Sequence, residues 1–219
     1  PETTKAPETE APKPVASKYI ALTFDDGPCE PMKEMIKKFA DIGGKATFFV
    51  VGCRISDRHD DSMLYAIQNG CELGGHAYNH IHLQEIEDAA LIKAHLIAPF
   101  NIVKARYGYD MSYSRLPYMT TNSLVYDVAK DLSMPLIGNS ITSGDWLEDA
   151  KAENVAAAVI DQAFDGSICC LHVKQTTCDA LDIILPELQK QGYEFVTVAE
   201  LARIKGATLR YNEQIGSIN

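Results

Sequence analysis

The stretch Tyr19-Ile20-Ala21-Leu22-Thr23-Phe24-Asp25-Asp26-Gly27-Pro28 decides how the rest of this sequence is interpreted. Its first six residues are apolar or favour extended backbone, which is typical of a short buried strand. Two carboxylates and a Gly-Pro turn follow directly. Taken alone, these four residues could be ordinary turn chemistry. Two adjacent carboxylates repel each other, however, and a site that keeps both ionised usually supplies a cation.

Segments with strand and helix character alternate from this strand to the end of the chain. Further strands are expected over 46–51, 71–75, 111–115, 135–139, 167–171 and 194–197. Helices are expected over 30–41, 56–68, 83–104, 123–131, 153–164, 178–191 and 198–204. Repeated β–α units imply an α/β fold with a parallel sheet and outer helices. About seven strands favour a distorted (β/α) barrel in a single domain over an open doubly wound sheet.

The composition excludes some classes of protein. Lys and Arg total 20 against 30 Asp and Glu, which gives a formal net charge of −10. A chain this acidic lacks the basic surface that holds nucleic acid. No apolar run is long enough to span a bilayer, so no membrane insertion is expected within this chain.

Residues 1–17 differ in composition from the remainder. They are rich in Pro, Thr and Glu and contain no large apolar residue, which predicts a disordered linker. The folded domain is expected over 18–219. We interpret the chain as part of a longer precursor whose upstream segment could anchor it to a membrane or join it to another module.

The six cysteines form no CxxC pair, so a zinc ribbon or a redox motif is not indicated. Cys29 and Cys178 are the first pair to test for a disulfide, because both follow candidate site segments. Free thiols buried as small apolar side chains are the equally weighted alternative.

Polar residues recur where the predicted strands end, and these carboxyl ends meet at one edge of a parallel sheet. They are Asp25, Asp26, His76, Arg115, Asp145, Trp146 and His172. His76 and His80 are four residues apart, so on one helical turn both imidazoles would point the same way and could bind one metal ion. Two histidines and one carboxylate leave open positions on the metal, as in catalytic sites.

On these residues the sequence resembles the polysaccharide deacetylases of carbohydrate esterase family four, the NodB-homology domain, over residues 19 to about 204. The matching motifs are Thr23–Pro28, His76-Ala77-Tyr78-Asn79-His80, Arg115-Leu116-Pro117-Tyr118, Asp145-Trp146 and Leu171-His172. Four motifs depart from the family pattern. Ala77 stands where the second motif usually has a hydroxyl residue, and Met119 stands where Gly often follows the third. Thr142 stands where the fourth motif begins with Asp, and Cys170 stands at the Leu of the fifth motif, Leu-x-His.

The resemblance implies a role for each matching position. Asp26, His76 and His80 would hold a divalent metal, with Zn²⁺ as the first expectation and Co²⁺, Ni²⁺ or Mn²⁺ as alternatives. A metal-bound water would attack the acetyl carbonyl with Asp25 as general base, held by Arg115, and with His172 as the acid. The expected substrate-binding residues are Tyr118, whose backbone N–H would stabilise the oxyanion, with Trp146, Leu171 and Pro117.

Thr142 bears on the mechanism. By resemblance, the missing Asp would support the acid His172, and a threonine supplies no charge. This predicts a lower pH optimum and slower release of an amine, and it raises the weight of O-acetyl substrates. The change Thr142→Asp is then expected to speed N-deacetylation.

The resulting expectation is a secreted bacterial hydrolase, extracellular or at the cell surface and monomeric. Its partner would be an acetylated polysaccharide, with N-acetylglucosamine residues of peptidoglycan or a chitin-like polymer first. The alternatives are an O-acetyl esterase acting on acetylxylan and a catalytically weak carbohydrate-binding homologue. A magnesium-dependent phosphotransferase is a poorer alternative, because the paired histidines would be unexplained and no phosphate-binding Gly loop is present.

Overall fold

A computed structural model describes residues 18–211 and 213–219 of the chain. The predicted disordered linker over 1–17 lies outside these residues. The strands are β1 (Lys18–Gly27), β2 (Thr47–Val50), β3 (Glu72–Gly75), β4 (Leu136–Ile137), β5 (Ile141–Thr142), β6 (Ser167–His172), β7 (Tyr193–Phe195) and β8 (Gln214–Ile215). The main sheet has the order β3-β2-β1-β6-β5, with β7 also paired to β1, and β4 pairs with β8.

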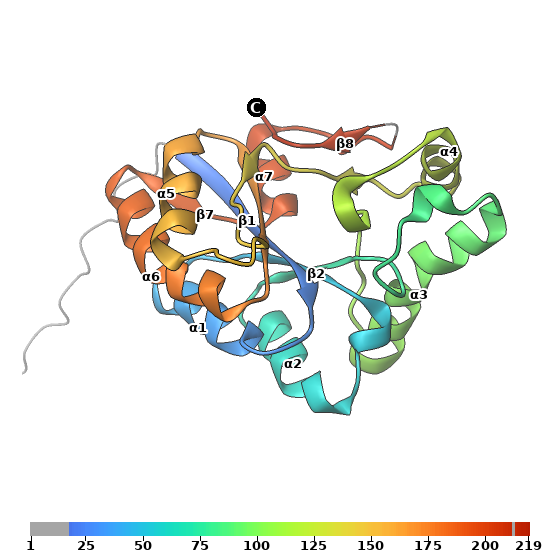
Figure 1. Cartoon of the computed structure of the whole chain (residues 1–219), viewed down its shortest axis with the longest axis horizontal. Coiled ribbons are helices and arrows are strands. Elements are labelled where there is room, and N and C mark those ends of the chain that lie inside the picture. The colour runs from blue at the N-terminus through green and yellow to red at the C-terminus, as the bar shows by residue number, and fades with distance from the viewer. Residues whose placement is uncertain (1–17, 212) are drawn as a thin grey trace, which may run out of the picture.

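The helices lie outside the sheet (Figure 1). They are α1 (Met32–Asp41), α2 (Asp60–Gln68), α3 (Ala89–Tyr107), α4 (Ser123–Asp131), α5 (Ala152–Gln162), α6 (Gln175–Lys190) and α7 (Val198–Lys205). Short 3₁₀ turns are η1 (Gly52–Arg54), η2 (Asp57–His59), η3 (Leu83–Glu85) and η4 (Pro117–Met119). No helix in the described part of the chain is long and apolar enough to cross a membrane.

The pairing of β1 explains its near-continuous apolar sequence. Its neighbours β2, β6 and β7 all run parallel to it, and residues 20–24 are completely buried. A strand covered on both faces has no polar side to alternate with. Ile20, Leu22 and Phe24 belong to the core that also contains side chains of α1, α5 and α6, whereas Ala21 belongs to the core under α7. Alternation along β1 therefore directs Asp25 to the α7 face of the sheet.

Every pairing between the named strands is parallel, which confirms the predicted α/β fold. Ser114 forms parallel bridges to both Gly75 and Leu136 and so connects β3 to β4. The strand expected over 111–115 is reduced to this one residue, because its neighbours β3 and β4 are too short to support a long ladder. Strands β5 and β8 were not predicted, since two residues carry no detectable alternation.

The long helix begins later than predicted. It was expected from Leu83, but residues 83–85 form the turn η3 and α3 begins at Ala89. The Asp88 carboxylate accepts the Ala90 N–H and caps the helix there. Gly108, with φ 66°, ends the helix in the left-handed conformation that favours glycine.

All six cysteines are free. The disulfide considered between Cys29 and Cys178 is therefore not formed. Cys178 is buried in the core beside α1 and α5, which agrees with the alternative that the thiol acts as a small apolar side chain.

Candidate active site

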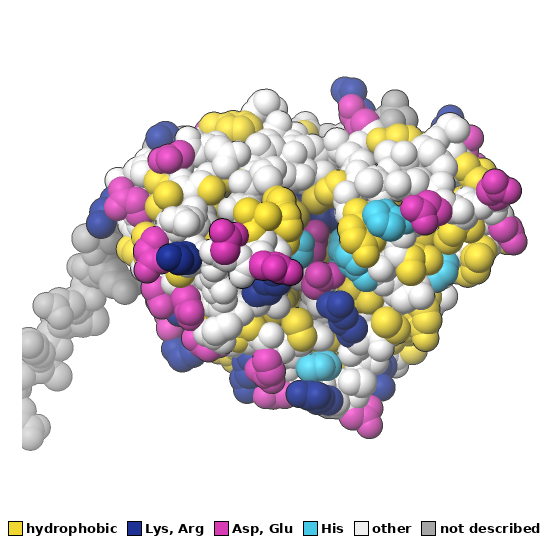
Figure 2. All heavy atoms as spheres, in the orientation of Figure 1, with side chains coloured by type: hydrophobic (Ala, Val, Ile, Leu, Met, Phe, Trp, Pro, Cys, Tyr) yellow, Lys and Arg dark blue, Asp and Glu magenta, His cyan; other side chains and the backbone are white. Residues whose placement is uncertain are grey.

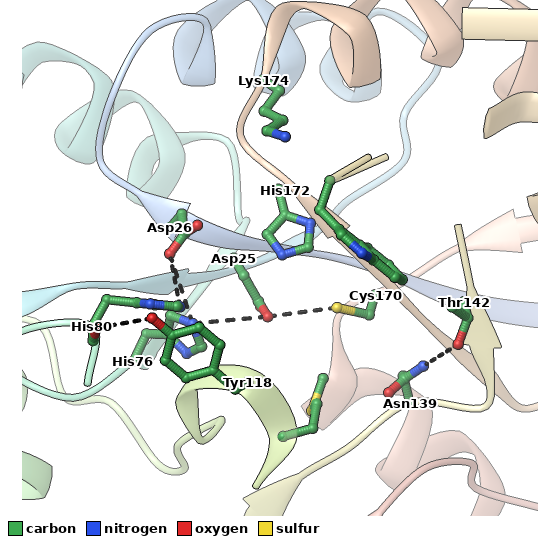
Figure 3. A pocket seen from close by; sticks show the side chains of 12 residues that line it. Asp25, Asp26, His76, His80, Tyr118, Asn139, Thr142, Cys170, His172 and Lys174 are labelled. Atoms are coloured by element: carbon green, nitrogen blue, oxygen red, sulfur yellow. Dashed lines mark hydrogen bonds and ion pairs between the residues drawn. The ribbon is translucent and has the colours of Figure 1, made fainter. Parts of the chain in front are cut away.

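A pocket of about 490 Å³ opens at the carboxyl ends of β1, β3 and β6. Figure 3 shows its side chains pointing toward one another, and Figure 2 shows histidine and acidic groups in the hollow of this face. The lining residues are Asp25, Asp26, His76, His80, Tyr118, Met119, Asn139, Thr142, Trp146, Cys170, His172 and Lys174. The predicted convergence of strand-end residues is thus observed.

A bulge at the end of β1 brings both aspartates into the pocket. Adjacent residues of a regular strand point to opposite faces. Here the register with β2 shifts between Phe24 and Gly27, and Asp26 adopts φ 71°. Aspartate tolerates this left-handed backbone better than most residues. The bulge therefore places two neighbouring carboxylates on the same wall.

The two histidines do not lie on a helical turn, so that part of the prediction was wrong. The segment after β3 is a loop in which Ala77 has φ 57°, which is incompatible with a right-handed helix. The loop nevertheless holds the two rings with centroids 5.1 Å apart. His76 Nδ1 lies 2.8 Å from the carbonyl oxygen of Arg115, so its Nε2 faces the pocket.

Asp26, His76 and His80 fit a divalent metal ion. Asp26 Oδ1 lies 3.9 Å from His76 Nε2 and 3.4 Å from His80 Nε2. The three potential ligand atoms all lie within 4.8 Å of one another. Asp26 Oδ1 is buried and has no hydrogen-bond partner among the described residues. One carboxylate oxygen without a hydrogen-bond partner and two imidazole nitrogens together form a set of ligands that zinc and similar ions prefer.

Arg115 holds Asp25 from below the pocket. The guanidinium is 0% exposed, and its NH1 donates to Asp25 Oδ1 at 2.9 Å. Its remaining contacts are Thr23 Oγ1 and the carbonyl oxygens of Ile137 and Gly138, with the Phe49 ring 4.3 Å away. Burial raises the pKa of Asp25, but the charge and hydrogen bond of Arg115, with help from the two neighbouring histidines, outweigh it and lower the pKa overall. Asp25 is thereby kept ionised although it is buried.

Asp145 supports His172 on the opposite wall. Its Oδ1 lies 2.8 Å from His172 Nδ1, and its Oδ2 accepts the His172 backbone N–H at 2.7 Å. Hydroxyl groups of Ser143 and Thr177 also donate to this carboxylate. Burial lowers the pKa of His172, but the hydrogen bond and charge of Asp145 outweigh it and raise the pKa overall. The imidazole is therefore protonated more readily than an ordinary histidine.

The premise of the prediction built on Thr142, that His172 lacks a supporting carboxylate, was wrong. The carboxylate that supports His172 comes from Asp145, so the threonine at position 142 does not remove a hydrogen-bond partner from the histidine. Thr142 Oγ1 accepts from Asn139 Nδ2 at 3.2 Å on an exposed part of the wall. The expectations of a lower pH optimum and of a bias toward O-acetyl substrates lose their basis.

The predicted substrate-binding residues divide into two groups. Tyr118 and Trp146 are 51% and 47% exposed and line the pocket. Leu171 and Pro117 do not line it. Leu171 is completely buried in the core, because alternation along β6 sends it to the face opposite Cys170 and His172. Pro117 is buried at the start of η4, where the following Tyr118 adopts φ 58°.

Sequence reasoning missed four lining residues: Met119, Asn139, Cys170 and Lys174. Cys170 could have been found, since it precedes His172 by two residues on a predicted strand and so shares its face. The other three lie on irregular segments or past a strand end, where no periodicity indicates direction.

A sequence profile described as polysaccharide deacetylase matches residues 13–137. The bifunctional xylanase/deacetylase of Pseudobutyrivibrio xylanivorans is 32% identical over 203 residues, covering 91% of this chain and 33% of that protein. The peptidoglycan-N-acetylglucosamine deacetylase PgdA of Listeria monocytogenes is 32% identical over 203 residues, covering 92% of this chain and 42% of that protein. The chain thus spans well under half the length of these two relatives.

Solved structures agree in fold. A family 4 acetyl xylan esterase from Clostridium thermocellum, in complex with a cobalt ion, has a TM-score of 0.84 and 31% identity, covering 92% of this chain and 99% of that one. The peptidoglycan deacetylase PdaC of Bacillus subtilis has a TM-score of 0.80 and 29% identity, covering 86% and 92%. By its sequence profile, its relatives and its fold, the chain belongs to the polysaccharide deacetylase family, carbohydrate esterase family four.

Proposed function

We propose that the domain over 18–219 hydrolyses acetyl groups from a polysaccharide, with N-acetylglucosamine residues of peptidoglycan or a chitin-like polymer as the first substrate. One observation carries this proposal: Asp25, paired with Arg115, and His172, paired with Asp145, lie in one pocket with the Asp26–His76–His80 cluster. The Arg115 pairing lowers the pKa of Asp25 and the Asp145 pairing raises the pKa of His172, which favours the ionised base and the protonated acid used in amide hydrolysis.

The proposed cofactor is a divalent cation held by Asp26, His76 and His80, with zinc first and cobalt, nickel or manganese as alternatives. When bound, it would polarise the acetyl carbonyl and acidify a water molecule. The donor set and the unpartnered Asp26 oxygen support this assignment. The solved relative that contains a cobalt ion is consistent with it.

Asp25 is the proposed general base. Its carboxylate would take the proton of the attacking water, and Arg115 keeps it ionised and fixed in direction. The Tyr118 backbone N–H is the proposed donor to the developing oxyanion; Tyr118 lines the pocket and has a left-handed backbone conformation.

His172 is the proposed general acid. Asp145 occupies Nδ1, so Nε2 carries the proton toward the pocket. An amine leaves the tetrahedral centre only when protonated, so a histidine with a raised pKa suits N-acetyl substrates. Trp146, whose ring lies edge-on to His172 with centroids 5.9 Å apart, would form the adjoining wall for the acetyl group or sugar.

The relatives named as peptidoglycan deacetylases favour peptidoglycan as substrate, and they favour action outside the cell or at its surface. An acetylxylan esterase is the second candidate, because the solved relatives include an acetyl xylan esterase. A binding module without activity is disfavoured by the intact base, acid and metal cluster. The monomeric state stays a prediction.

The test is acetate release from N-acetylated and O-acetylated glycans, with metal analysis of the same samples. We expect release from N-acetylglucosamine oligomers that stops after chelation and returns with Zn²⁺ or Co²⁺. A carbohydrate-binding homologue would release no acetate from any glycan while still retaining the polymer.

A further inference from the structure

A second group of potential metal ligands lies beside the first. Asp25, Cys170 and His172 each offer one ligand atom, and these atoms lie within 4.8 Å of one another. None of the three belongs to the cluster of Asp26, His76 and His80. The group combines a carboxylate, a thiol and an imidazole, which is the mixture of donors that zinc and softer divalent ions accept.

The register of two central strands creates this group. Asp25 of β1 pairs with His172 of β6, and Cys170 lies two residues earlier on β6, on the same face. Cys170 Sγ lies 3.5 Å from Asp25 Oδ2. All three side chains line the pocket, so an ion entering from solvent can reach them.

Neighbouring residues orient two of the three ligands, Asp25 and His172, while leaving one atom of each available. Arg115 contacts Asp25 through Oδ1, which leaves Oδ2 on the Cys170 side. Asp145 contacts His172 through Nδ1, which leaves Nε2 for the pocket. A carboxylate on the far nitrogen of a histidine is the arrangement that orients metal-binding histidines in proteins.

We propose that Asp25, Cys170 and His172 form a second, inhibitory site for a thiophilic divalent cation such as Cd²⁺ or excess Zn²⁺. On binding, the ion forms bonds to Sγ of Cys170 and to Nε2 of His172, and the protons that these two atoms carried are released to solvent. The oxygen of Asp25 and the Nε2 of His172 complete three protein ligands, and solvent takes the remaining positions. The inhibition rests on the proposed function, because the ion would bind to the proposed base and the proposed acid. The binding of the ion does not rest on that function.

The test measures binding of Cd²⁺ alone to the metal-depleted protein by equilibrium dialysis, with the ultraviolet absorption of the cadmium–thiolate bond as a second signal. The wild type should bind two ions and show the thiolate band. Cys170→Ser and Cys170→Ala should bind one ion and lose the band. The matched control Cys53→Ser removes an exposed free thiol and should keep both ions and the band.

A variant with a damaged first cluster separates the two sites. His80→Ala should lose one ion and catalysis but retain the cadmium–thiolate band, so binding at the second site is measurable whether or not the domain is a deacetylase. In active protein, excess Cd²⁺ should reduce acetate release at least about tenfold in the wild type and much less in Cys170→Ser, each relative to its own rate with one ion bound. One bound ion in the wild type, or a thiolate band unchanged in Cys170→Ser and Cys170→Ala, would overturn the proposal.

Discussion

Each of the two walls of the pocket carries a titratable group whose charged form is stabilised by a partner of opposite charge, and the two partners differ. On one wall, the buried carboxylate of Asp25 is paired with Arg115, whose charge persists at every relevant pH. On the other wall, the imidazole of His172 is paired with Asp145, so the net charge of this pair changes when His172 gains or loses its proton. A permanent cation fixes a base in its ionised state, whereas a carboxylate partner leaves the acid free to lose and regain its proton. The predictions below test this difference.

Removal of the base should have the largest effect on activity. Asp25→Asn keeps the shape of the side chain but cannot accept a proton, so we expect acetate release to fall roughly 10²- to 10⁴-fold. The measurement is the rate on N-acetylglucosamine oligomers, with metal content determined in parallel. A rate within a few fold of the wild type, at full metal occupancy, would exclude Asp25 as the base.

Loss of the Arg115 guanidinium should reduce the free energy of unfolding more than the other substitutions. Arg115→Met leaves a buried carboxylate unpaired, which typically costs about 3–5 kcal/mol of the free energy of unfolding. Denaturant titration measures this loss. Arg106→Met is the matched control, because Arg106 pairs with exposed Asp57 and Asp60 on the surface, and its loss should be much smaller.

The pH dependence of that loss has a defined sign. Arg115 lowers the pKa of folded Asp25, so the stabilisation is fully present above the pKa of the unfolded carboxyl group and disappears as pH falls through the lower folded pKa. The stability difference between wild type and Arg115→Met should therefore shrink in acid. A difference that is constant down to the acid range would mean that Arg115 stabilises the fold by packing alone.

Loss of the titratable partner should shift the pH profile. Asp145→Asn removes the charge that raises the pKa of His172, so protonated His172 is lost at lower pH. The alkaline limb of kcat against pH should move down, and the rate at neutral pH should fall about 10- to 100-fold, as for other carboxylates that support a functional histidine. An unmoved alkaline limb would show that another group is the acid.

Thr142→Asp should have the smallest effect. Because Asp145 already supplies the carboxylate beside His172, we expect the rate of acetate release to change less than about twofold and its pH profile to stay in place. A tenfold change in rate would correspond to about 1.4 kcal/mol in the activation free energy. The ratio of N- to O-deacetylation measures it. A clear gain in N-deacetylation would restore the sequence-based interpretation of Thr142.

Much of the site could be predicted from the sequence. Asp25, Asp26, His76, His80, Arg115 and His172 were identified because they stand in motifs that resemble those of the family, and most of these motifs follow a predicted strand of the parallel sheet. The details that failed depend on the local backbone conformation and on the direction in which strand residues point. The positive φ of Ala77 turned a predicted helical pair of histidines into a loop pair, and the missed alternation along β6 exchanged Leu171 for Cys170 on the pocket wall.

By itself, the sequence determined the α/β class, the apolar central strand and the identity of the charged groups at the strand ends, because these follow from local periodicity and residue chemistry. Only the tertiary structure decided which carboxylate supports which histidine. Asp145 and His172 are 27 residues apart in the chain, and their contact arises from packing of the segment after β5 against the end of β6. The placement of Cys170 beside Asp25 arises in the same way, since strand register brings together residues separated by 145 positions.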